Sequence, residues 1–410
     1  MNRRVVVTGM AGISPLGNDW QSIRTRLGEY RNAIQRMDDW ATYDGLNTQL
    51  GAPAAPFELP KRYDRKATRS MGRVALLATR ATELALANAG LLDHPLLTSG
   101  DMGVSFGSSA GTTSAIGDFG RMIEERTTRG INATTYIKMM AHTAPVNIGV
   151  FFGLTGRVIT TSSACTSGSQ GIGYAYEAIK AGRQTAMVAG GAEELCATEA
   201  AVFDTLFATS VRNDTPGLTP TPFDARRDGL VIGEGAGCLI LEEREHALAR
   251  GAAIHAELVG FGTNSDGTHV TQPNAATMQT AMALALRDAG LAPSAIGYVN
   301  AHGTATQQGD LAETQATSAL FGKRMPISSL KSYMGHTLGA CGALEAWISI
   351  EMMREGWFAP TLNLTEVDPQ CGELDYIRGE GRHIDCDYVM TNNFAFGGIN
   401  TSLIFKRHVQ

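Results

Sequence analysis

The sequence predicts an α/β protein whose sheets are covered by helices on both faces. Short, uniformly apolar runs such as RVVVTG (4–9) and TAMVAGG (185–191) have the length and composition of buried strands. Between such runs lie segments with helical spacing of apolar residues, at 73–90 and 276–290, the second of which ends in a glycine suited to a helix C-cap. Buried strands that alternate with helices are typical of this fold class, because a sheet that is apolar on both faces needs a helical layer on each.

Seven further apolar runs complete the set of expected strands. In chain order they are 156–161, 237–243, 255–262, 296–303, 325–330, 388–393 and 401–406. The runs at 4–9 and 255–262 resemble each other, since a glycine turn and a polar residue follow both. This likeness suggests two related halves, as a duplication would produce. We place the halves at 1–252 and 253–410.

Composition and charge exclude several classes of function. The chain has 410 residues, 43% of them hydrophobic, which is enough for a large core in two to three domains or one duplicated domain. A formal net charge of −6 argues against a nucleic-acid binder that relies on a broad basic field. No apolar run approaches the roughly 18 residues of a membrane span, and the six cysteines are scattered without C-x-x-C pairs. We therefore expect a cytoplasmic protein without membrane insertion.

One local exception to the acidic balance is KRYDRKATRSMGR at 61–73, with six basic residues and one acidic residue. Its first interpretation is a solvated helix face. Its second is a docking patch for an acidic partner.

The stretch TSSACTSGSQGIGYAYEAIKAG at 161–182 supports two different chemistries. Tyr176 and Lys180 share a helix face, with Ser163 upstream, as in short-chain dehydrogenases. That interpretation needs a glycine-rich turn that binds the pyrophosphate of a dinucleotide. In RVVVTGMAGIS, however, Ile13 stands where the last glycine of that turn is required, and Pro15 interrupts the turn. The dehydrogenase interpretation is therefore disfavoured.

The second chemistry is a cysteine nucleophile. Cys165 lies between small residues, after the expected strand 156–161 and before a glycine- and alanine-rich helix expected at 168–181. At a helix N-terminus the macrodipole favours the thiolate. A free thiol has a pKa of about 8.5, so a nucleophilic role needs this helix end or a nearby histidine to lower that pKa. The alternative is a buried structural thiol.

Two of the nine histidines lie in glycine-framed segments at the ends of expected strands. His302 belongs to AHGTATQQGD at 301–310, and His336 belongs to KSYMGHTLGACGALE at 331–345. Together with a cysteine at a helix start in the other half, they suggest three reactive groups that meet in a cleft between the halves.

The motifs around these three residues resemble those of a known family. SSACTSG, AHGTAT, KSYMGHTLGACGALE and NNFAFGGIN, in this order and spacing, resemble the elongating β-ketoacyl-[acyl-carrier-protein] synthases of the synthase II type. VVVTG at the start, TPFDARRDGLVIGEGAG at 221–237 and ELVGFG at 257–262 match as well, so the resemblance covers essentially the whole chain. It implies a thiolase-like fold, with two related α/β halves in a five-layered α-β-α-β-α arrangement, and a tight dimer.

The resemblance also implies a two-stage Claisen condensation. Cys165 would take an acyl group from the phosphopantetheine thioester of acyl carrier protein. Malonyl-carrier protein would then lose its carboxylate, and the resulting enolate would attack the acyl-cysteine and lengthen the chain by two carbons. No metal and no cofactor beyond the phosphopantetheine arm of the substrates are expected.

Site residues follow by match to the family motifs, residue by residue. His302 and His336 match the histidine pair that stabilises the enolate, and the backbone N–H groups of Cys165 and Phe396 match the oxyanion hole. The remaining matches are the supporting pair Lys331 and Glu345, the pantetheine-path threonines Thr304 and Thr306, the acyl-pocket residues Ala110 and Phe203, and the basic docking helix with Arg65, Lys66 and Arg69.

Three positions depart from the family pattern. Ala395 stands where the gating turn usually has glycine, and it would be strained if that position needs φ > 0. Ala110 replaces a bulky aliphatic residue of the acyl pocket, and Phe207 stands where an arginine often meets the carrier protein. These departures suggest a specialised relative.

Three functions stay open. The first is elongation in fatty-acid synthesis by a homodimer. The second is a bacterial type II polyketide or aryl-polyene ketosynthase that forms a heterodimer with a chain-length-factor-like subunit. The third, from another class, is a non-catalytic dimer partner, which the presence of Cys165 disfavours.

Overall fold

The computed structural model describes residues 3–408. The first half of the chain contributes five strands to the large sheet, in the spatial order β1-β8-β6-β4-β5. Strand β4 pairs in parallel with both of its neighbours, β5 and β6. The pairs β6–β8 and β8–β1 are antiparallel. The bounds of these strands are β1 Val5–Ile13, β4 Met102–Gly107, β5 Val158–Thr161, β6 Ala186–Glu193 and β8 Gly235–Glu243.

The second half repeats this order and these directions. Its strands run β9-β16-β15-β10-β11, with the short β13 at the outer edge, and they are again parallel around β10 and antiparallel from β15 to β9. Their bounds are β9 Ala256–Ser265, β10 Tyr298–Asn300, β11 Pro326–Ser328, β13 Asp375–Tyr376, β15 Tyr388–Ala395 and β16 Ile399–Arg407. A three-residue antiparallel pairing of β1 with β9 joins both halves into one eleven-stranded sheet.

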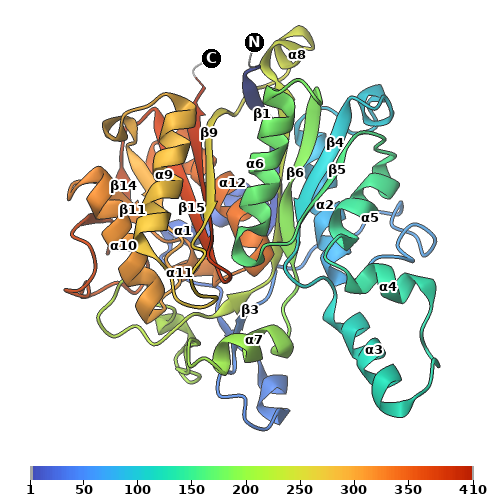
Figure 1. The fold of residues 1–410 in the computed structure, drawn as a ribbon, viewed down its shortest axis with the longest axis horizontal. Helices are drawn as coiled ribbons and strands as arrows, with labels where there is room; N and C mark the ends of the chain where they lie inside the picture. Colours follow the sequence, from blue (N-terminus) through green and yellow to red (C-terminus); the bar gives the residue numbers. More distant parts are fainter. Residues whose placement is uncertain (1–2, 409–410) are drawn as a thin grey trace.

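Helices fill three layers around these strands (Figure 1). On the outer side of the first half lie α2 (Arg73–Asn88) and α5 (Thr143–Phe152), and on the outer side of the second half lie α9 (Ala275–Ala289) and α10 (Gln307–Phe321). Between the two halves lie α6 (Ser167–Lys180) and α12 (Cys341–Glu355), which contact each other and strands of both halves. This α-β-α-β-α layering confirms the predicted fold class.

The two central helices pack unusually closely, which explains the glycines of α6. A Cβ atom on Gly168 would lie only 2.9 Å from the carbonyl oxygen of Gly339, just before α12. The sequence of α12 is largely apolar and most of its residues are buried, as expected of a helix enclosed by two sheets. This close contact positions the start of α6 against the segment that precedes α12.

The remaining elements are short or lie at the periphery. The helices are α1 Trp20–Gly28, α3 Thr113–Glu125, α4 Ala133–Met139, α7 Ala197–Asp204, α8 Arg244–Ala249 and α11 Lys331–Met334. The small strands are β2 Gln35–Arg36, β3 Leu50–Ala52, β7 Ile232–Gly233, β12 Trp357–Phe358 and β14 Arg382–His383. Within residues 3–408, none of the helices has the length and apolar character needed to cross a membrane.

Most expected elements are present within a few residues of their predicted bounds. All nine apolar runs contain a strand, and the runs at 73–90 and 276–290 form α2 and α9, with Gly290 at φ 66° as the C-cap. Strand β4 was missed, because MGVSFG is short and carries two glycines and a serine. The proposed boundary near residue 252 falls in the segment that joins α8 to β9, and this division stays a prediction.

The basic docking helix was predicted wrongly. Residues 61–71 form a series of turns, and helix α2 begins only at Arg73. Asp64 caps the first of these turns, because its carboxylate accepts hydrogen bonds from the N–H groups of Lys66 and Ala67, both at 2.8 Å. The extended backbone of Gly72 (φ −93°, ψ −172°) then separates the turns from α2.

Candidate active site

Cys165 lies at the turn that joins β5 to α6. Ala164, directly before it, has φ 50° in the left-handed region, and a single 3₁₀ turn then leads into α6. The hydroxyl of Ser167 holds this turn, since it accepts from the N–H of Ser163 (3.0 Å) and donates to the carbonyl of Ala164 (2.7 Å). A non-glycine residue in left-handed backbone costs about 1 kcal/mol or more, and such strain clusters at functional sites.

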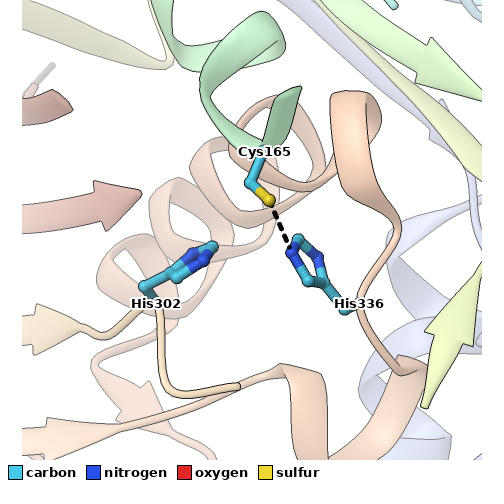
Figure 2. A group of neighbouring side chains, drawn as sticks. All are labelled: Cys165, His302 and His336. Atoms are coloured by element: carbon cyan, nitrogen blue, oxygen red, sulfur yellow. Dashed lines mark hydrogen bonds between the residues drawn. The ribbon is translucent and has the colours of Figure 1, made fainter. Parts of the chain in front are cut away.

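Two histidines from the second half face this cysteine (Figure 2). His336 Nε2 lies 3.0 Å from Cys165 Sγ, and the rings of His302 and His336 are 5.1 Å apart at 88°. His302 follows β10, and His336 follows the short helix α11. The three side chains are buried. The sulfur of Cys165 and one ring nitrogen of each histidine all lie within 4.8 Å of one another. The structure thus brings together the three groups that sequence analysis placed in one site.

Hydrogen bonds to the far nitrogen of each imidazole assign its tautomer. The backbone N–H of Leu338 donates to His336 Nδ1 at 3.2 Å, so the proton of the neutral ring lies on Nε2. The side-chain amide of Asn393 approaches His302 Nδ1 at 3.5 Å, which favours the same tautomer there. Both rings therefore direct an N–H donor into the site, and Cys165 Sγ accepts one of them.

Burial keeps all three groups neutral in the resting protein. Loss of water around His302 and His336 lowers the pKa of both imidazoles well below the usual value, and the nearby Lys331 charge adds to this effect. Burial also raises the pKa of Cys165 to about 11, against the opposing effects of Lys331 and of the N–H groups of Phe396 and Cys165. The lowering of the thiol pKa that a nucleophilic role was expected to need, from the helix end or a histidine, is therefore absent in the free protein, because desolvation exceeds the effects that lower the pKa.

We expect the rate of alkylation of Cys165 by iodoacetamide to rise about tenfold per pH unit between about pH 7 and pH 10, because the thiolate is the reactive form and the pKa lies near 11. Peptide mass spectrometry over a pH series measures this rate. Cys238, buried with a pKa raised to about 12, is the matched control and should react more slowly. A rate that levels off near pH 8.5 would contradict the assignment.

A buried ion pair supports the histidines. Lys331 Nζ lies 2.5 Å from Glu345 Oε1, and both side chains are at most 1% exposed. The other carboxylate oxygen, Oε2, accepts from Asn393 Nδ2 at 2.7 Å. Because Asn393 also reaches His302, the ion pair and the imidazole form one connected polar network. Sequence analysis predicted Lys331 and Glu345 as a pair, and the structure places them in contact.

A cavity of about 330 Å³ leads from the surface to the reactive groups. Cys165, His302 and His336 lie along it, together with Phe396. Thr304 and Thr306 also line it, with their hydroxyl groups 2.9 Å apart, as expected of residues on a substrate path. The cavity can therefore admit a narrow, partly polar arm with its reactive end at the cysteine.

Comparison with known proteins identifies the chain. The family model described as "Beta-ketoacyl synthase, N-terminal domain" matches residues 2–247, and that described as "Beta-ketoacyl synthase, C-terminal domain" matches residues 255–365. The chain belongs to the β-ketoacyl synthase family. Members of this family are enzymes of the acyltransferase type, as the resemblance implied.

Relatives match over essentially the full length. The 3-oxoacyl-[acyl-carrier-protein] synthase 2 of Synechocystis sp. is 36% identical over 99% of this chain and 98% of its own. A solved β-ketoacyl synthase from Burkholderia phymatum is 61% identical, with a TM-score of 0.98 over 99% of this chain and 100% of its own. The solved ishigamide ketosynthase/chain length factor is 28% identical, with a TM-score of 0.89 over 100% of both chains.

Three polar residues of this synthase site were missed by sequence analysis. Glu313 on α10 accepts from the N–H groups of His302 and Gly303, both at 2.7 Å, and burial raises its pKa to about 8. Glu193 at the end of β6 accepts from Gly339 N–H at 3.1 Å and lies close enough to Cys165 to raise the pKa of that thiol. Asn393 was quoted within NNFAFGGIN, but no role was assigned to it.

The predicted acyl-pocket and gate residues lie near the site, but only some of them line its cavity. Phe203 packs against Phe396, with ring centroids 5.1 Å apart, whereas Ala110 is half-buried and its N–H lies 3.4 Å from Glu193 Oε1. Neither Ala110 nor Phe203 lines the 330 Å³ cavity. Ala395 ends β15 with ordinary negative φ, and only the glycines after Phe396 are left-handed, so the anticipated strain at Ala395 is absent.

The residues of the rejected dehydrogenase interpretation have a structural role. Lys180 Nζ donates to the Tyr176 hydroxyl at 2.8 Å and to Asp288 Oδ1 at 2.5 Å, which ties the C-terminal end of α6 to α9. By contrast, the predicted docking residues Arg65, Lys66 and Arg69 are all exposed, as a docking surface requires.

Proposed function

We propose that this synthase condenses an acyl group held on Cys165 with malonyl-acyl carrier protein, and that the residues named above carry the reaction. The observation that carries the proposal is the meeting of Cys165 Sγ with two imidazole Nε2–H donors at the inner end of a narrow cavity. A nucleophile and two neutral donors suit a reaction that first binds an acyl group and then stabilises an enolate.

In the first stage Cys165 attacks the thioester carbonyl carbon of the acyl donor. A C–S bond forms to Cys165 while the bond to the pantetheine sulfur breaks, and the cysteine proton ends on the departing thiolate. The N–H groups of Cys165 and Phe396, which both lower the pKa of the thiol, are proposed to hold the carbonyl oxygen as it becomes negative.

In the second stage the carbon–carbon bond to the malonyl carboxylate breaks and releases carbon dioxide. The negative charge moves to the thioester oxygen, where the Nε2–H groups of His302 and His336 donate to it. The enolate carbon then attacks the acyl carbon, and the C–S bond to Cys165 breaks. The thiolate regains a proton, which restores the resting site.

The experiment that tests this function is a single-turnover reaction of the purified protein with an acyl-carrier protein and malonyl-carrier protein. We expect a carrier-bound β-ketoacyl product two carbons longer than the donor acyl group, together with one carbon dioxide per product. Intact mass spectrometry measures both the product and the acyl-protein intermediate. Transfer of the acyl group without any two-carbon extension would contradict the proposal.

The carrier protein is proposed to dock at the mouth of the cavity. Phe207 lines this mouth with an 88% exposed ring and left-handed backbone (φ 53°), and exposed Val270 lies on the same rim. The relative from Synechocystis sp. carries acyl carrier protein in its name. A large exposed aromatic side chain in strained backbone suggests that a bound partner covers it.

We expect Phe207→Ala to raise the KM for the carrier-bound substrate about tenfold while kcat stays within about twofold, because the ring contributes binding area and no chemistry. Steady-state kinetics with malonyl-carrier protein measures the two constants. Leu218→Ala, which removes another exposed apolar side chain that does not line the cavity, is the control. An unchanged KM in Phe207→Ala would exclude this docking position.

A dimer is also proposed. Strand β5 forms an open sheet edge, where Val158 is 52% exposed, and Val150 on α5 and Ile123 on α3 expose further apolar surface. The likeness to a ketosynthase/chain length factor favours a heterodimer as a second candidate assembly, with a role in polyketide or aryl-polyene synthesis. Light scattering of the purified protein distinguishes the two, because a homodimer forms alone and a heterodimer requires the second subunit.

The intact set of Cys165, His302 and His336 makes a non-catalytic partner role the weakest of the three functions. We also place the enzyme in the cytoplasm, because all six cysteines are free thiols and most are buried.

A further inference from the structure

Helix α7 carries a buried carboxyl group that makes no hydrogen bond of ordinary geometry with the residues the structure describes. Glu199 is 6% exposed, and neither of its oxygens has a hydrogen-bond partner among the described residues. The Cys196 thiol lies close enough to raise the pKa of this carboxyl, but its hydrogen bond is with Thr198 Oγ1 at 2.9 Å. Buried polar groups are nearly always bonded, so such a group needs an explanation.

Neighbouring acidic side chains show that donors are available in this region but are used elsewhere. Glu193 accepts from the hydroxyl of Ser108 (2.9 Å) and from backbone N–H groups, and Glu194 Oε1 accepts from the N–H and the hydroxyl of Thr113 (2.8 and 2.6 Å). Burial and the charges of these two carboxylates raise the pKa of Glu199 well above its usual value. A protonated carboxyl group offers one donor and one acceptor, which suits a neutral polar ligand.

The position of Glu199 links this carboxyl to the reactive cysteine. Phe203 lies one helical turn further along α7, on the same buried face, and packs against Phe396. Phe396 in turn lines the 330 Å³ cavity, and its N–H group is near enough to lower the pKa of Cys165. Side-chain contacts therefore connect the cavity wall at Phe396, through Phe203, to the buried face of α7 that carries Glu199.

We propose that Glu199 is a specificity-determining residue that binds a hydroxyl or carbonyl group on the acyl chain carried by Cys165. The preferred acyl donors are then chains that carry such a group some distance from the thioester, rather than plain alkyl chains of the same length. Most of the surrounding cluster is apolar, with Ala200, Phe203, Leu338 and Phe396, so the rest of the chain would be hydrocarbon or aromatic. This inference rests on the proposed function of Cys165.

The test compares acyl-carrier proteins in pairs of equal chain length, one with a terminal hydroxyl group and one with a terminal methyl group, over a series of lengths. The rate of acylation of Cys165 is followed by intact mass spectrometry, with acetyl-carrier protein as a chain too short to reach α7. We expect the wild-type enzyme to favour the hydroxyl member about tenfold at one or two lengths, as a single neutral hydrogen bond allows.

Three variants assign the preference to Glu199. Glu199→Gln keeps a neutral donor and acceptor and should retain most of the preference, whereas Glu199→Leu should reverse it. Glu194→Gln alters the neighbouring carboxylate that is already paired with Thr113, and it should leave the preference unchanged. All three variants should accept acetyl groups at the rate of the wild type.

Two results would overturn the inference. One is equal acylation by both members of every pair in the wild-type enzyme. The other is an unchanged preference in Glu199→Leu, which would show that the carboxyl does not contact the acyl chain. If no acyl group, including acetyl, reaches Cys165 in the wild-type enzyme, the proposed function itself fails, and this outcome differs from the other two.

Discussion

Cys165→Ala should abolish condensation and leave decarboxylation of malonyl-carrier protein largely intact. Removal of an attacking nucleophile costs roughly 10⁴- to 10⁶-fold in turnover, because no acyl-enzyme can form. The orientation of the His302 and His336 rings does not depend on the sulfur. The Leu338 N–H contacts Nδ1 of His336, and Asn393, itself bonded to Glu345, contacts Nδ1 of His302. The enolate should therefore still form, and protonation should convert malonyl-carrier protein to acetyl-carrier protein.

The two partial reactions are measured separately, by the mass of the acyl-protein and by the release of carbon dioxide. Cys386→Ala, which removes another buried thiol, is the matched control and should retain both reactions. His302→Ala should lower decarboxylation about 10²- to 10³-fold, the usual cost of one oxyanion donor. If Cys165→Ala lost decarboxylation to the same extent as condensation, the separation of roles between the thiol and the histidines would be wrong.

The reactive groups could be found from the sequence because each sits in its own short motif. SSACTSG, AHGTAT and KSYMGHTLGACGALE contain Cys165, His302 and His336, and glycine and small residues around each force a turn at the end of a strand. Those strands are apolar and easily recognised, so their ends could be placed in one cleft. The fold class followed from the same strands and the helices between them.

What could not be predicted depends on neighbours that are distant in sequence. In the sequence Glu313 looks like any other helix residue, and it bonds to His302 only because α10 packs against the turn after β10. Glu193 bonds to Gly339 only because the two halves of the chain pack against each other. A lowered thiol pKa was expected to come from the helix end or from a nearby histidine, but burial by the whole surrounding structure raises it. The basic segment 61–71 forms turns rather than a helix, and the extended backbone of Gly72 separates it from α2.

Lys331→Met should lower the free energy of unfolding by about 3–5 kcal/mol, the usual cost of removing one member of a buried ion pair. Glu345 is fully buried and would keep only the hydrogen bond from Asn393. A loss of this size corresponds to a fall in Tm of about 4 °C for a chain of this length. Calorimetry measures the fall. The double variant Lys331→Met, Glu345→Leu should recover most of the stability, because a pair of apolar side chains leaves no buried charge.

A second measurement separates the electrostatic role of Lys331 from its structural role. Its charge lowers the pKa of Cys165, so the thiol of Lys331→Met should have a pKa above 11 and should be alkylated more slowly at every pH below that value. The same loss of charge removes one cause that keeps His302 and His336 neutral, although burial, the largest cause, still keeps them neutral. The double variant should regain stability but not the alkylation rate, because it also lacks the cation. Recovery of both together would mean that the pair acts on the thiol only by holding the structure in place.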